Sequence, residues 1–574
     1  MNIRKLQKKL DARFGGRVRV REEDGARRVT GELDDWNDVV AACYMCAEKF
    51  SKTHVVNDIH FTGGTDTSVR HPSLRDSALE GRRPDVLVIG GGISGASILR
   101  ELTKWKLDAL LIEKGSDLAA GASSRNTGEV HPGVDLNRGS LKQHYEILGN
   151  HLFDTLCQEL DVPFERSGQY ACVRMGALRP LLSLLCLYRR VVCGTRGTRI
   201  MGKKELYERN PHLAPGYKFA VYDWSAGVVC PYGLTIAMAE NAVTNGAAVS
   251  LSTECEGMEL ENGRITAVHT NRGTVYPRVV VNAAGTFCEE IARMAGDRFF
   301  SIHPRRGTNS IVDKADRGLI SGVASGALDR SNVRAHTKGG CIAPTAHGNI
   351  LVGPDAVETW EKENYATTRE SVQWSFERQK RTVPSLTERD MITCFTGVRA
   401  PSFEEDFILE RGRKTENLVH VAAIQSPGLT AAPAFAADMA KLCVQILGGA
   451  PENPAFDPHR RGYGRVAGMS RNEREALIAK DPDYGVIVCR CEEVSKGEIL
   501  DALRAPICVP TVDAVKRRVR PGSGRCQGGF CGPLVTQIIA DYMHEPVQAV
   551  TKDGGRSIIN FGPAKGRGGE AEEV

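Results

Sequence analysis

The sequence predicts an α/β protein of several domains, with a dinucleotide-binding domain followed by a small cysteine-bearing domain. Three observations predict it. A short apolar strand runs directly into the glycine-rich turn at residues 90–95 and then into a helical stretch. Near the end of the chain, four cysteines follow the pattern C-x-C-x34-C-x4-C. At 574 residues the chain is too long for a single hydrophobic core, so we expect about two or three domains.

Residues 1–80 form a separate block, for which we predict a small α+β module. Residues 34–50 have helical spacing, with Asp34 or Asp35 as the N-cap. Cys43 and Cys46 lie on one flank of this helix and are expected as small core residues; a redox pair or half a zinc site is the alternative. The strand–strand–helix–strand order weakly resembles a BON-like module. The strands are expected at residues 17–20, 28–33 and 54–59.

Residues 85–113 carry the parts of a dinucleotide-binding fingerprint in the right order. An apolar strand, a G-x-G-x-x-G turn, a helix, a second apolar strand and an acidic residue follow one another. In this arrangement Gly90 permits the tight turn, Gly92 lets the backbone approach a pyrophosphate, and Gly95 lets the helix pack on the strand. The N-terminus of the helix offers N–H groups to the phosphates, and Glu113 can accept hydrogen bonds from ribose hydroxyls.

The sequence contains only one such fingerprint. A flavoenzyme that also binds a nicotinamide dinucleotide in a domain of its own would normally carry two. The single fingerprint therefore favours FAD as the one dinucleotide, with reducing equivalents leaving the flavin by another route.

Four further stretches carry residues suited to a flavin site. They are the loop Gly-Ala-Ser-Ser-Arg-Asn-Thr-Gly-Glu-Val-His-Pro-Gly at 121–133, residues 224–234 with the meander that ends at 279–285, residues 395–401, and residues 423–430. With them, residues 84–446 resemble the D-amino-acid oxidase/glycerol-3-phosphate dehydrogenase superfamily of FAD enzymes, in particular the anaerobic glycerol-3-phosphate dehydrogenase large-subunit type and L-2-hydroxyglutarate oxidases. The resemblance implies a Rossmann-type FAD-binding domain at 84–448, interleaved with an antiparallel-sheet substrate part mainly at 160–222 and 300–394.

The resemblance also implies which residues hold FAD. Cys255 would act through its backbone, near the adenine. The helix expected at 431–447 would point its N-terminus at the N1–C2=O edge of the flavin, where reduction places negative charge that a helix dipole favours. The implied FAD-binding residues are Gly90, Gly91, Gly92, Ile93, Ser94, Gly95, Glu113, Lys114, Ser123, Ser124, Asn126, Thr127, Gly128, Cys255, Ala284, Gly285, Gly397, Gly428, Leu429 and Thr430.

Three residues are candidates for the catalytic site. The resemblance places Arg399 over the flavin face, where its planar guanidinium would bind the carboxylate or phosphate of a small anionic substrate; a surface ion pair is the alternative. His131 is the candidate base, because its family position lies near the flavin ring and imidazole exchanges protons near neutrality; a buried structural histidine is the alternative. Arg306 is the third candidate. Relatives often carry Lys-Gly-Glu-Tyr where this chain has Arg306-Gly307-Thr308-Asn309, so the side chains that shape the pocket differ.

Cys489, Cys491, Cys526 and Cys531 are candidate metal ligands. Their spacing allows one tetrahedral set around structural zinc or two pairs around a [2Fe-2S] cluster. The C-x-C is unusual for structural zinc, and nearby glycines could donate backbone N–H groups to cluster sulfurs. The segment resembles the bacterioferritin-associated ferredoxin-like [2Fe-2S] domain, which favours the cluster. We expect this domain at residues 484–545, after a linker at 449–483 and before a tail at 546–574.

The composition and the apolar pattern limit the partners. Seventy-five Lys and Arg against 70 Asp and Glu give a net charge of +5, too small to favour nucleic acid as a partner. No apolar run approaches the roughly 20 residues needed to cross a bilayer; the best, residues 181–187, is soon interrupted by Tyr188-Arg189-Arg190. Seventeen cysteines without an export signal are expected as reduced thiols or metal ligands. We therefore expect a cytoplasmic protein, with peripheral association at the inner face of the membrane and oligomerisation left open.

A flavin takes two electrons together, whereas a [2Fe-2S] cluster takes one at a time, so a chain with both implies an electron converter. The leading hypothesis is an FAD-dependent dehydrogenase that oxidises sn-glycerol 3-phosphate to dihydroxyacetone phosphate. Electrons would pass from FAD to the [2Fe-2S] cluster and on to a quinone or a partner protein. The alternatives are a dehydrogenase of L-2-hydroxyglutarate, another 2-hydroxy acid or an amino acid, and a non-catalytic FAD/[2Fe-2S] electron-transfer subunit.

Overall fold

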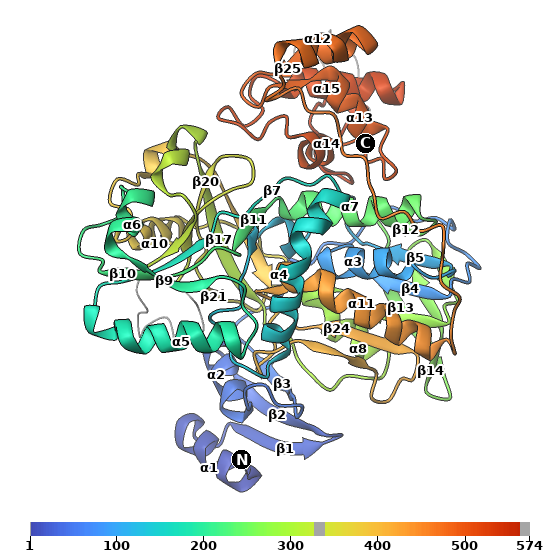
Figure 1. The fold of residues 1–574 in the computed structure, drawn as a ribbon. Helices are drawn as coiled ribbons and strands as arrows, with labels where there is room; N and C mark the ends of the chain where they lie inside the picture. The colour runs from blue at the N-terminus through green and yellow to red at the C-terminus, as the bar shows by residue number, and fades with distance from the viewer. Residues whose placement is uncertain (1, 327–338, 563–574) are drawn as a thin grey trace. The chain divides into compact units, whose positions relative to one another are not determined.

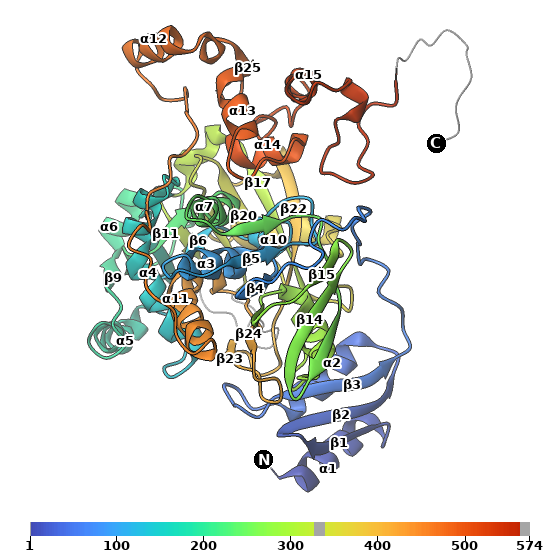
Figure 2. The ribbon, with the colours of Figure 1, turned by 90° about the vertical axis from the view of Figure 1, so that its right-hand side faces the viewer.

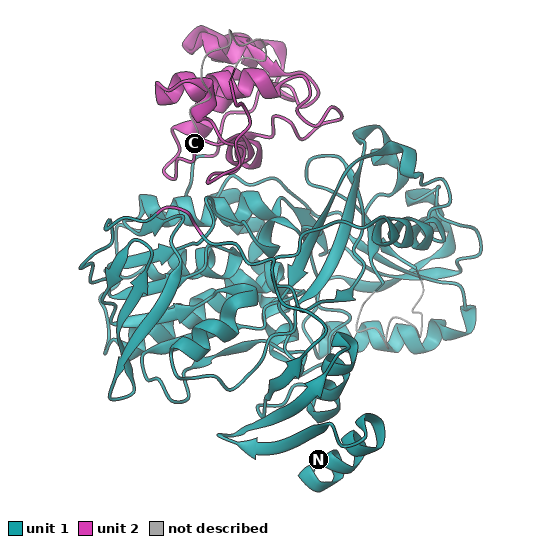
Figure 3. Ribbon diagram, turned by 180° about the vertical axis from the view of Figure 1, so that it is seen from behind, with its two compact units in different colours: residues 1–71, 75–461 teal, residues 72–74, 462–574 magenta. Residues whose placement is uncertain are grey.

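The computed structural model describes residues 2–326 and 339–562. The chain divides into two compact units: residues 1–71 with 75–461, and residues 72–74 with 462–574 (Figure 3). Each unit is described by itself below. Residues 327–338 of the expected substrate part and residues 563–574 of the expected tail lie outside the described residues.

The first residues of unit 1 fold into a three-stranded sheet with two helices (Figure 2). The expected strands and helix are present, whereas helix α1 is absent from the prediction, although Leu6, Leu10 and Phe14 recur on its buried side. Cys43 and Cys46 are buried in the same core, and burial raises the pKa of the Cys46 thiol to about 12, as for a core residue. The elements are α1 (Ile3–Phe14), β1 (Val18–Glu23), β2 (Ala26–Leu33), α2 (Trp36–Cys46) and β3 (Val55–Phe61), with β1 and β2 antiparallel and β2 and β3 parallel.

A six-stranded sheet with the order β12-β5-β4-β16-β24-β23 forms the centre of unit 1 (Figure 1). Its strands pair in parallel except for β23, and the four residues of β4 and of β5 are all apolar and all buried, as strands covered on both faces require. Helix α3 packs against α7 and α11, and α11 packs against α4. The elements are β4 (Val86–Ile89), α3 (Ile93–Leu102), β5 (Ala109–Ile112), α4 (Leu141–Glu159), α7 (Pro231–Thr244), β12 (Ala248–Ser250), β16 (Val279–Asn282), α8 (Cys288–Met294), β23 (Ile408–Arg411), β24 (Leu418–Ala422) and α11 (Gly428–Ile446).

Two small sheets flank this centre. The meander β13-β14-β15 lies between β12 and β16 in the sequence and is antiparallel throughout. The sheet β6-β11-β7 ties the loop that carries His131 to the strand before α7. The strands are β6 (Glu129–Val130), β7 (Phe164–Glu165), β11 (Gly227–Val229), β13 (Cys255–Glu261), β14 (Arg264–Thr270) and β15 (Gly273–Val275).

A mostly antiparallel nine-stranded sheet is built from two separate parts of the chain. Strands β8 to β10 and β17 to β22 alternate in sequence with the six-stranded sheet but form one sheet of their own, with β22 paired to β17. This confirms the predicted interleaving of a substrate part with the nucleotide-binding part. The elements are β8 (Gln169–Val173), α5 (Arg179–Val191), β9 (Thr198–Gly202), α6 (Lys203–Arg209), β10 (Phe219–Asp223), β17 (Arg305–Val312), β18 (Val323–Ser325), β19 (Cys341–Pro344), β20 (Ile350–Gly353), β21 (Val357–Glu358), α10 (Arg369–Lys380) and β22 (Met391–Arg399).

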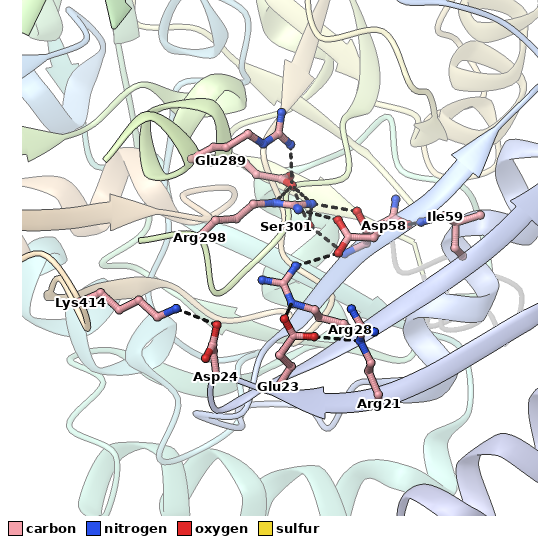
Figure 4. Close-up of polar contacts among 12 residues, drawn as sticks. Arg21, Glu23, Asp24, Arg28, Asp58, Ile59, Glu289, Arg298, Ser301 and Lys414 are labelled. Carbon is pink, nitrogen blue, oxygen red and sulfur yellow. Dashed lines mark hydrogen bonds and ion pairs between the residues drawn. The ribbon is translucent and has the colours of Figure 1, made fainter. Parts of the chain in front are cut away.

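Polar and apolar contacts join the N-terminal sheet to the rest of unit 1. Phe403, which follows β22, is buried in the hydrophobic core of the N-terminal residues. Asp58 of β3 accepts hydrogen bonds from Arg28 at 2.8 Å and from Arg298 at 2.5 Å, and Arg298 also pairs with Glu289 of α8 at 2.7 Å (Figure 4). The N-terminal sheet is therefore packed onto the α/β part and shares side chains with it.

Unit 2 is a small, mainly helical fold around one core of buried apolar residues. Helix α12 lies within the stretch expected as a linker and begins with a complete capping box of Ser470 and Glu473. Among the described residues of the chain, no helix combines the length and apolar character that a membrane span needs. The elements are α12 (Arg471–Lys480), β25 (Ile487–Cys489), β26 (Val494–Ser495), α13 (Lys496–Leu503), α14 (Val512–Val519) and α15 (Gly532–Met543).

Candidate functional site

The glycine-rich turn between β4 and α3 leaves no room for side chains. A Cβ on Gly95 would lie 1.9 Å from the carbonyl oxygen of Gly90, and a Cβ on Gly90, whose φ is +114°, would lie 2.5 Å from that of Ala283. Gly92 caps α3 without a side chain, so the helix N-terminus is bare backbone. A cradle of this kind fits a pyrophosphate held by backbone N–H groups and the helix dipole.

Glu113 lies at the end of β5, beside this turn. Its carboxylate accepts hydrogen bonds from the backbone N–H groups of Gly91 at 2.6 Å and Gly115 at 2.7 Å. Burial raises the pKa of the Glu113 carboxyl above its usual value, against these two bonds. The next residue, Lys114, lies over the ring of Phe287 at 3.7 Å and pairs with Glu363 at 2.9 Å. The acidic side chain is thus held where the ribose of a bound dinucleotide is expected.

The loop at 121–133 passes over the same turn. The hydroxyl of Ser123 accepts a hydrogen bond from the N–H of Ile93 at 2.9 Å, and Asn126 donates to the carbonyl of Ala122 at 3.1 Å. A Cβ on Gly397 of β22 would lie 2.4 Å from the carbonyl oxygen of Arg125, so a glycine there lets the loop lie against the strand. The structure therefore brings the loop, the glycine turn and β22 together.

His131 lies at the end of this loop, with a polar side chain near each ring nitrogen. Nδ1 lies 3.3 Å from a carboxylate oxygen of Glu129, and Nε2 lies 3.3 Å from the hydroxyl of Ser426. Its backbone N–H donates to the hydroxyl of Thr430 at 3.0 Å, and Asn150 donates to its carbonyl at 2.9 Å. The imidazole is thus fixed between β6 and the start of α11. Glu129 is missing from the sequence-based candidates, although it stands two residues before His131 in the same motif.

Helix α11 begins three residues earlier than expected, so Gly428, Leu429 and Thr430 form its first turn instead of a preceding loop. No side chain caps this helix end, which begins after Pro427. Among the other predicted FAD residues, Ala284 and Gly285 follow β16 after one intervening residue. Cys255 is buried, and its thiol donates to the carbonyl of Gly257 at 3.8 Å.

Arg399 and Arg306 lie on the paired strands β22 and β17. Arg399 stands opposite Arg305, and its side chain lies across Gly307, where a Cβ would be only 2.1 Å from its Nη2 atom. Its guanidinium donates to the carbonyl of Asp355 at 3.0 Å, and burial together with Arg305 lowers the pKa of Arg399 to about 10. Among the described residues, the buried Nε of Arg306 has no hydrogen-bond partner. Because neighbouring residues of a strand point to opposite faces, Arg306 projects away from the face that carries Arg305 and Arg399, and the structure does not bring the two predicted arginines together.

A buried charge network lies behind Arg399 and was missed from the sequence. Arg305 donates to the carboxylate of Glu358 at 2.6 Å and to the hydroxyl of Tyr44 at 2.8 Å, and its guanidinium lies 3.3 Å from Glu405. Gln425, next to Ser426, donates to Glu405 at 2.6 Å. Tyr44 comes from α2, so no local pattern could have joined it to residues more than 250 positions away.

The four C-terminal cysteines line one pocket of unit 2, of about 340 Å³. The sulfurs of Cys491 and Cys526 are 3.7 Å apart, and the thiol of Cys531 donates a hydrogen bond to Cys489, which lowers the pKa of Cys489 to about 5. The thiols thus lie as two pairs, each pair joining one cysteine from each motif. Across the described ranges, no three His, Cys, Asp or Glu side chains are placed to hold one metal ion. Four thiols gathered at one pocket fit a metal centre with four cysteine ligands.

Comparison with family models decides the family. A model described as "FAD dependent oxidoreductase" matches residues 85–442, and one described as "BFD-like [2Fe-2S] binding domain" matches residues 487–541. The chain belongs to the FAD-dependent oxidoreductase family. This FAD-dependent oxidoreductase is 36% identical to a glycerol 3-phosphate dehydrogenase of Caloramator mitchellensis over 84% of the chain and 99% of that protein. It is 24% identical to anaerobic glycerol-3-phosphate dehydrogenase subunit A1 of Haloferax volcanii over 82% of the chain and 85% of that protein.

Solved structures agree with this assignment. The reduced L-α-glycerophosphate oxidase from Mycoplasma pneumoniae with FAD bound matches with a TM-score of 0.60 and 25% identity, over 66% of this chain and 98% of that one. The glycerol-3-phosphate dehydrogenase from Bacillus halodurans complexed with FAD matches in fold, with a TM-score of 0.60 and 17% identity over 82% of this chain and 92% of that one. The predictions of an FAD enzyme with a second, [2Fe-2S] cofactor are confirmed. The roles of individual residues remain predictions.

Proposed function

We propose that this FAD-dependent oxidoreductase is a dehydrogenase that converts sn-glycerol 3-phosphate to dihydroxyacetone phosphate. The observation that carries the proposal is the 36% identity to a protein of that name along 99% of its length. The site supports it, because the partly buried guanidinium of Arg399 suits a phosphate group. The phosphate of a small alcohol phosphate is a strongly negative group that such a guanidinium can bind.

Alcohol oxidation needs two functions from the residues of the chain: one residue binds the anionic group of the substrate, and another acts as a base. Arg399 binds the phosphate and so orients the carbon that bears the hydroxyl. His131 accepts the hydroxyl proton at Nε2, the atom that now contacts Ser426. The carboxylate of Glu129, 3.3 Å from Nδ1, would stabilise the imidazolium that forms. The bound FAD supplies the hydride acceptor.

The electron route is part of the same proposal. Cys489, Cys491, Cys526 and Cys531 would hold the [2Fe-2S] cluster, which drains electrons one at a time toward a quinone or a partner protein. The presence of both cofactor domains on one chain and the similarity to a dehydrogenase subunit support this route. We place this activity on the cytoplasmic side of the membrane.

A second candidate substrate is L-2-hydroxyglutarate or another 2-hydroxy acid. The chain is 25% identical to an L-2-hydroxyglutarate dehydrogenase of Indibacter alkaliphilus over 60% of the chain and 95% of that protein. A guanidinium binds a carboxylate with the same fork geometry as a phosphate. Arg399 is therefore compatible with sn-glycerol 3-phosphate and with a 2-hydroxy acid. The non-catalytic relay has no comparable support.

Anaerobic reduction of the bound flavin tests the proposal. The purified holoprotein is mixed without oxygen with sn-glycerol 3-phosphate, with L-2-hydroxyglutarate or with buffer, and the flavin absorbance is followed. We expect rapid bleaching with sn-glycerol 3-phosphate alone. Bleaching only by L-2-hydroxyglutarate would reject sn-glycerol 3-phosphate as the substrate and support the second candidate. Bleaching by neither compound would reject both candidates.

A further inference from the structure

The hydroxyl of Tyr44 lies in the buried charge network behind Arg399, although Tyr44 belongs to helix α2 beside the N-terminal sheet. It donates a hydrogen bond to the carboxylate of Glu405 at 2.5 Å and accepts one from Arg305 at 2.8 Å. It also lies 3.2 Å from Nε2 of His303. Burial raises the pKa of Tyr44 well above its usual value, so the hydroxyl keeps the proton that it donates. A side chain from the first 61 residues thus contributes to the polar interior beside the candidate anion site.

Arg305 connects Tyr44 to this site. It is 3% exposed and stands opposite Arg399 where β17 pairs with β22. Burial and the neighbouring charge of Arg305 lower the pKa of Arg399. Arg305 itself lies 2.6 Å from a carboxylate oxygen of Glu358 and 3.3 Å from one of Glu405. These carboxylates neutralise Arg305 from within the protein, and Arg399 can then be neutralised by a ligand.

Glu405 lies in a turn that the N-terminal residues and helix α4 hold from two sides. Its φ is +61°, in the left-handed region where residues other than glycine are uncommon and strained. On one side, the carboxylate of Glu404 accepts a hydrogen bond from the N–H of Val55 in β3 at 2.8 Å. On the other side, Asp406 accepts hydrogen bonds from N–H groups at the start of α4 at 2.9 Å. These contacts fix the Glu405 carboxylate where the Tyr44 hydroxyl reaches it.

We propose that Tyr44 is a positioning residue for binding the anionic group of the substrate. Its hydroxyl holds Arg305 against Glu405, and Arg305 in turn fixes the direction in which the neighbouring Arg399 extends. Without the hydroxyl, a buried N–H of Arg305 and an oxygen of Glu405 each lose a hydrogen bond, and both groups shift to recover one. The inference rests on the proposed role of Arg399 as the anchor, and not on which anionic substrate it binds.

Replacing Tyr44 by Phe in the full-length holoprotein tests the inference, because it removes the hydroxyl and keeps the ring. The substrate is whichever of sn-glycerol 3-phosphate and L-2-hydroxyglutarate bleaches the flavin. We expect KM to rise about fivefold or more while kcat, counted per bound flavin, stays within about twofold, as for an interaction that binds the substrate without taking part in the chemistry. An unfolded fraction without flavin does not enter either value.

Tyr207→Phe is the matched control. The Tyr207 hydroxyl donates to the carbonyl of Ala214 at 2.7 Å and accepts a hydrogen bond from the N–H of Tyr217 at 3.2 Å, and its ring packs against the core of the nine-stranded sheet. Tyr207→Phe therefore also removes a hydrogen-bonded hydroxyl from a partly buried ring. Its KM should equal that of the wild type.

A double-mutant cycle shows whether Tyr44 acts through Arg399. Arg399→Lys should raise KM by itself, because lysine lacks the planar fork. In that background Tyr44→Phe should raise KM by less than about twofold, since two residues on one path are not additive. A side chain that only stabilised the fold would change KM by the same factor in both backgrounds. Equal factors in both backgrounds, or an unchanged KM in Tyr44→Phe, would overturn the inference.

Inorganic phosphate separates this inference from the proposed function. It is titrated calorimetrically into the oxidised holoprotein, so the measurement needs no turnover. We expect Tyr44→Phe to bind phosphate about fivefold or more weakly than the wild type, and Tyr207→Phe to bind it equally well. If neither candidate substrate reduced the flavin, the proposed function would fail, and this titration would still decide the role of Tyr44. Phosphate binding that is the same in the wild type and Tyr44→Phe, including no binding by either, would overturn that role.

Discussion

At the scale of single residues, the candidate site depends on side chains held from two sides. His131 is held between Glu129 and Ser426, and Arg399 lies across Gly307. Substitutions at His131 and at Gly307 should therefore change activity, and a third substitution, at Glu405, should change stability.

Replacing His131 by Asn should remove the proposed base but keep a side chain of similar size. We expect kcat/KM for sn-glycerol 3-phosphate to fall by about 10²–10⁴, the usual contribution of a positioned base. The flavin content should stay at the wild-type level, measured from the absorbance of the released cofactor. A variant with full activity would exclude His131 as the base.

Replacing Gly307 by Ala should displace the Arg399 guanidinium, since the added Cβ would lie 2.1 Å from its Nη2 atom. We expect a rise in KM for the anionic substrate of roughly tenfold or more, the effect of a lost charged hydrogen bond. The control is Gly202→Ala on β9, where a Cβ meets no atom within 4 Å. An unchanged KM in the Gly307 variant would mean that Arg399 does not bind the substrate.

Replacing Glu405 by Gln should make stability depend on pH in a defined way. Although burial opposes it, Lys142 and Arg305 lower the pKa of Glu405 below its usual value of 4.5. The carboxylate therefore contributes stability that is present above about pH 4.5 and is lost as the pH falls through the lower, folded-state pKa. We expect the variant to unfold at a lower temperature than the wild type at pH 7, by calorimetry, and the difference to shrink as the pH is lowered below 4.5. A constant difference would contradict this assignment.

At the scale of elements, the N-terminal sheet is attached by side chains that reach across to α8 and to the segment after β22. Asp58 of β3 binds Arg28 and Arg298, and Phe403 fills the apolar core of the N-terminal residues. These contacts make the small sheet a part of unit 1. The attachment is open to a direct test.

Replacing Asp58 by Ala should leave Arg28 and Arg298 without their shared carboxylate (Figure 4). We expect unfolding to become easier by about 2 kcal/mol, as for lost hydrogen bonds between charged groups. Limited proteolysis should also release residues 1–61 faster. Asp24→Ala is the control, because its pair with Lys414 is exposed and should change neither measurement. Equal behaviour of the two variants would show that Asp58 does not secure the sheet.

At the scale of the whole molecule, the chain carries two redox domains with separate binding sites. If electrons leave the flavin through the cluster, replacing Cys491 by Ser should remove the iron–sulfur absorbance and stop transfer to a quinone acceptor. Reduction of the flavin by substrate should persist. Cys508→Ser is the control, since Cys508 is an exposed thiol outside the cysteine pocket. Continued quinone reduction by the Cys491 variant would reject the proposed route.

The sequence by itself determined the parts whose chemistry is local. The glycine turn, the strands around it and the four cysteines follow from spacing alone, because a phosphate cradle or a set of thiolates needs particular residues at short intervals. The family and both cofactors could therefore be predicted, while the domain limits remain predictions. Only the tertiary structure decided which thiols of the four cysteines lie in contact, that Gly307 makes room for Arg399, and that Tyr44 reaches Arg305. These contacts join residues far apart in the chain, and the packing of separate sheets, which no local pattern encodes, brings them together.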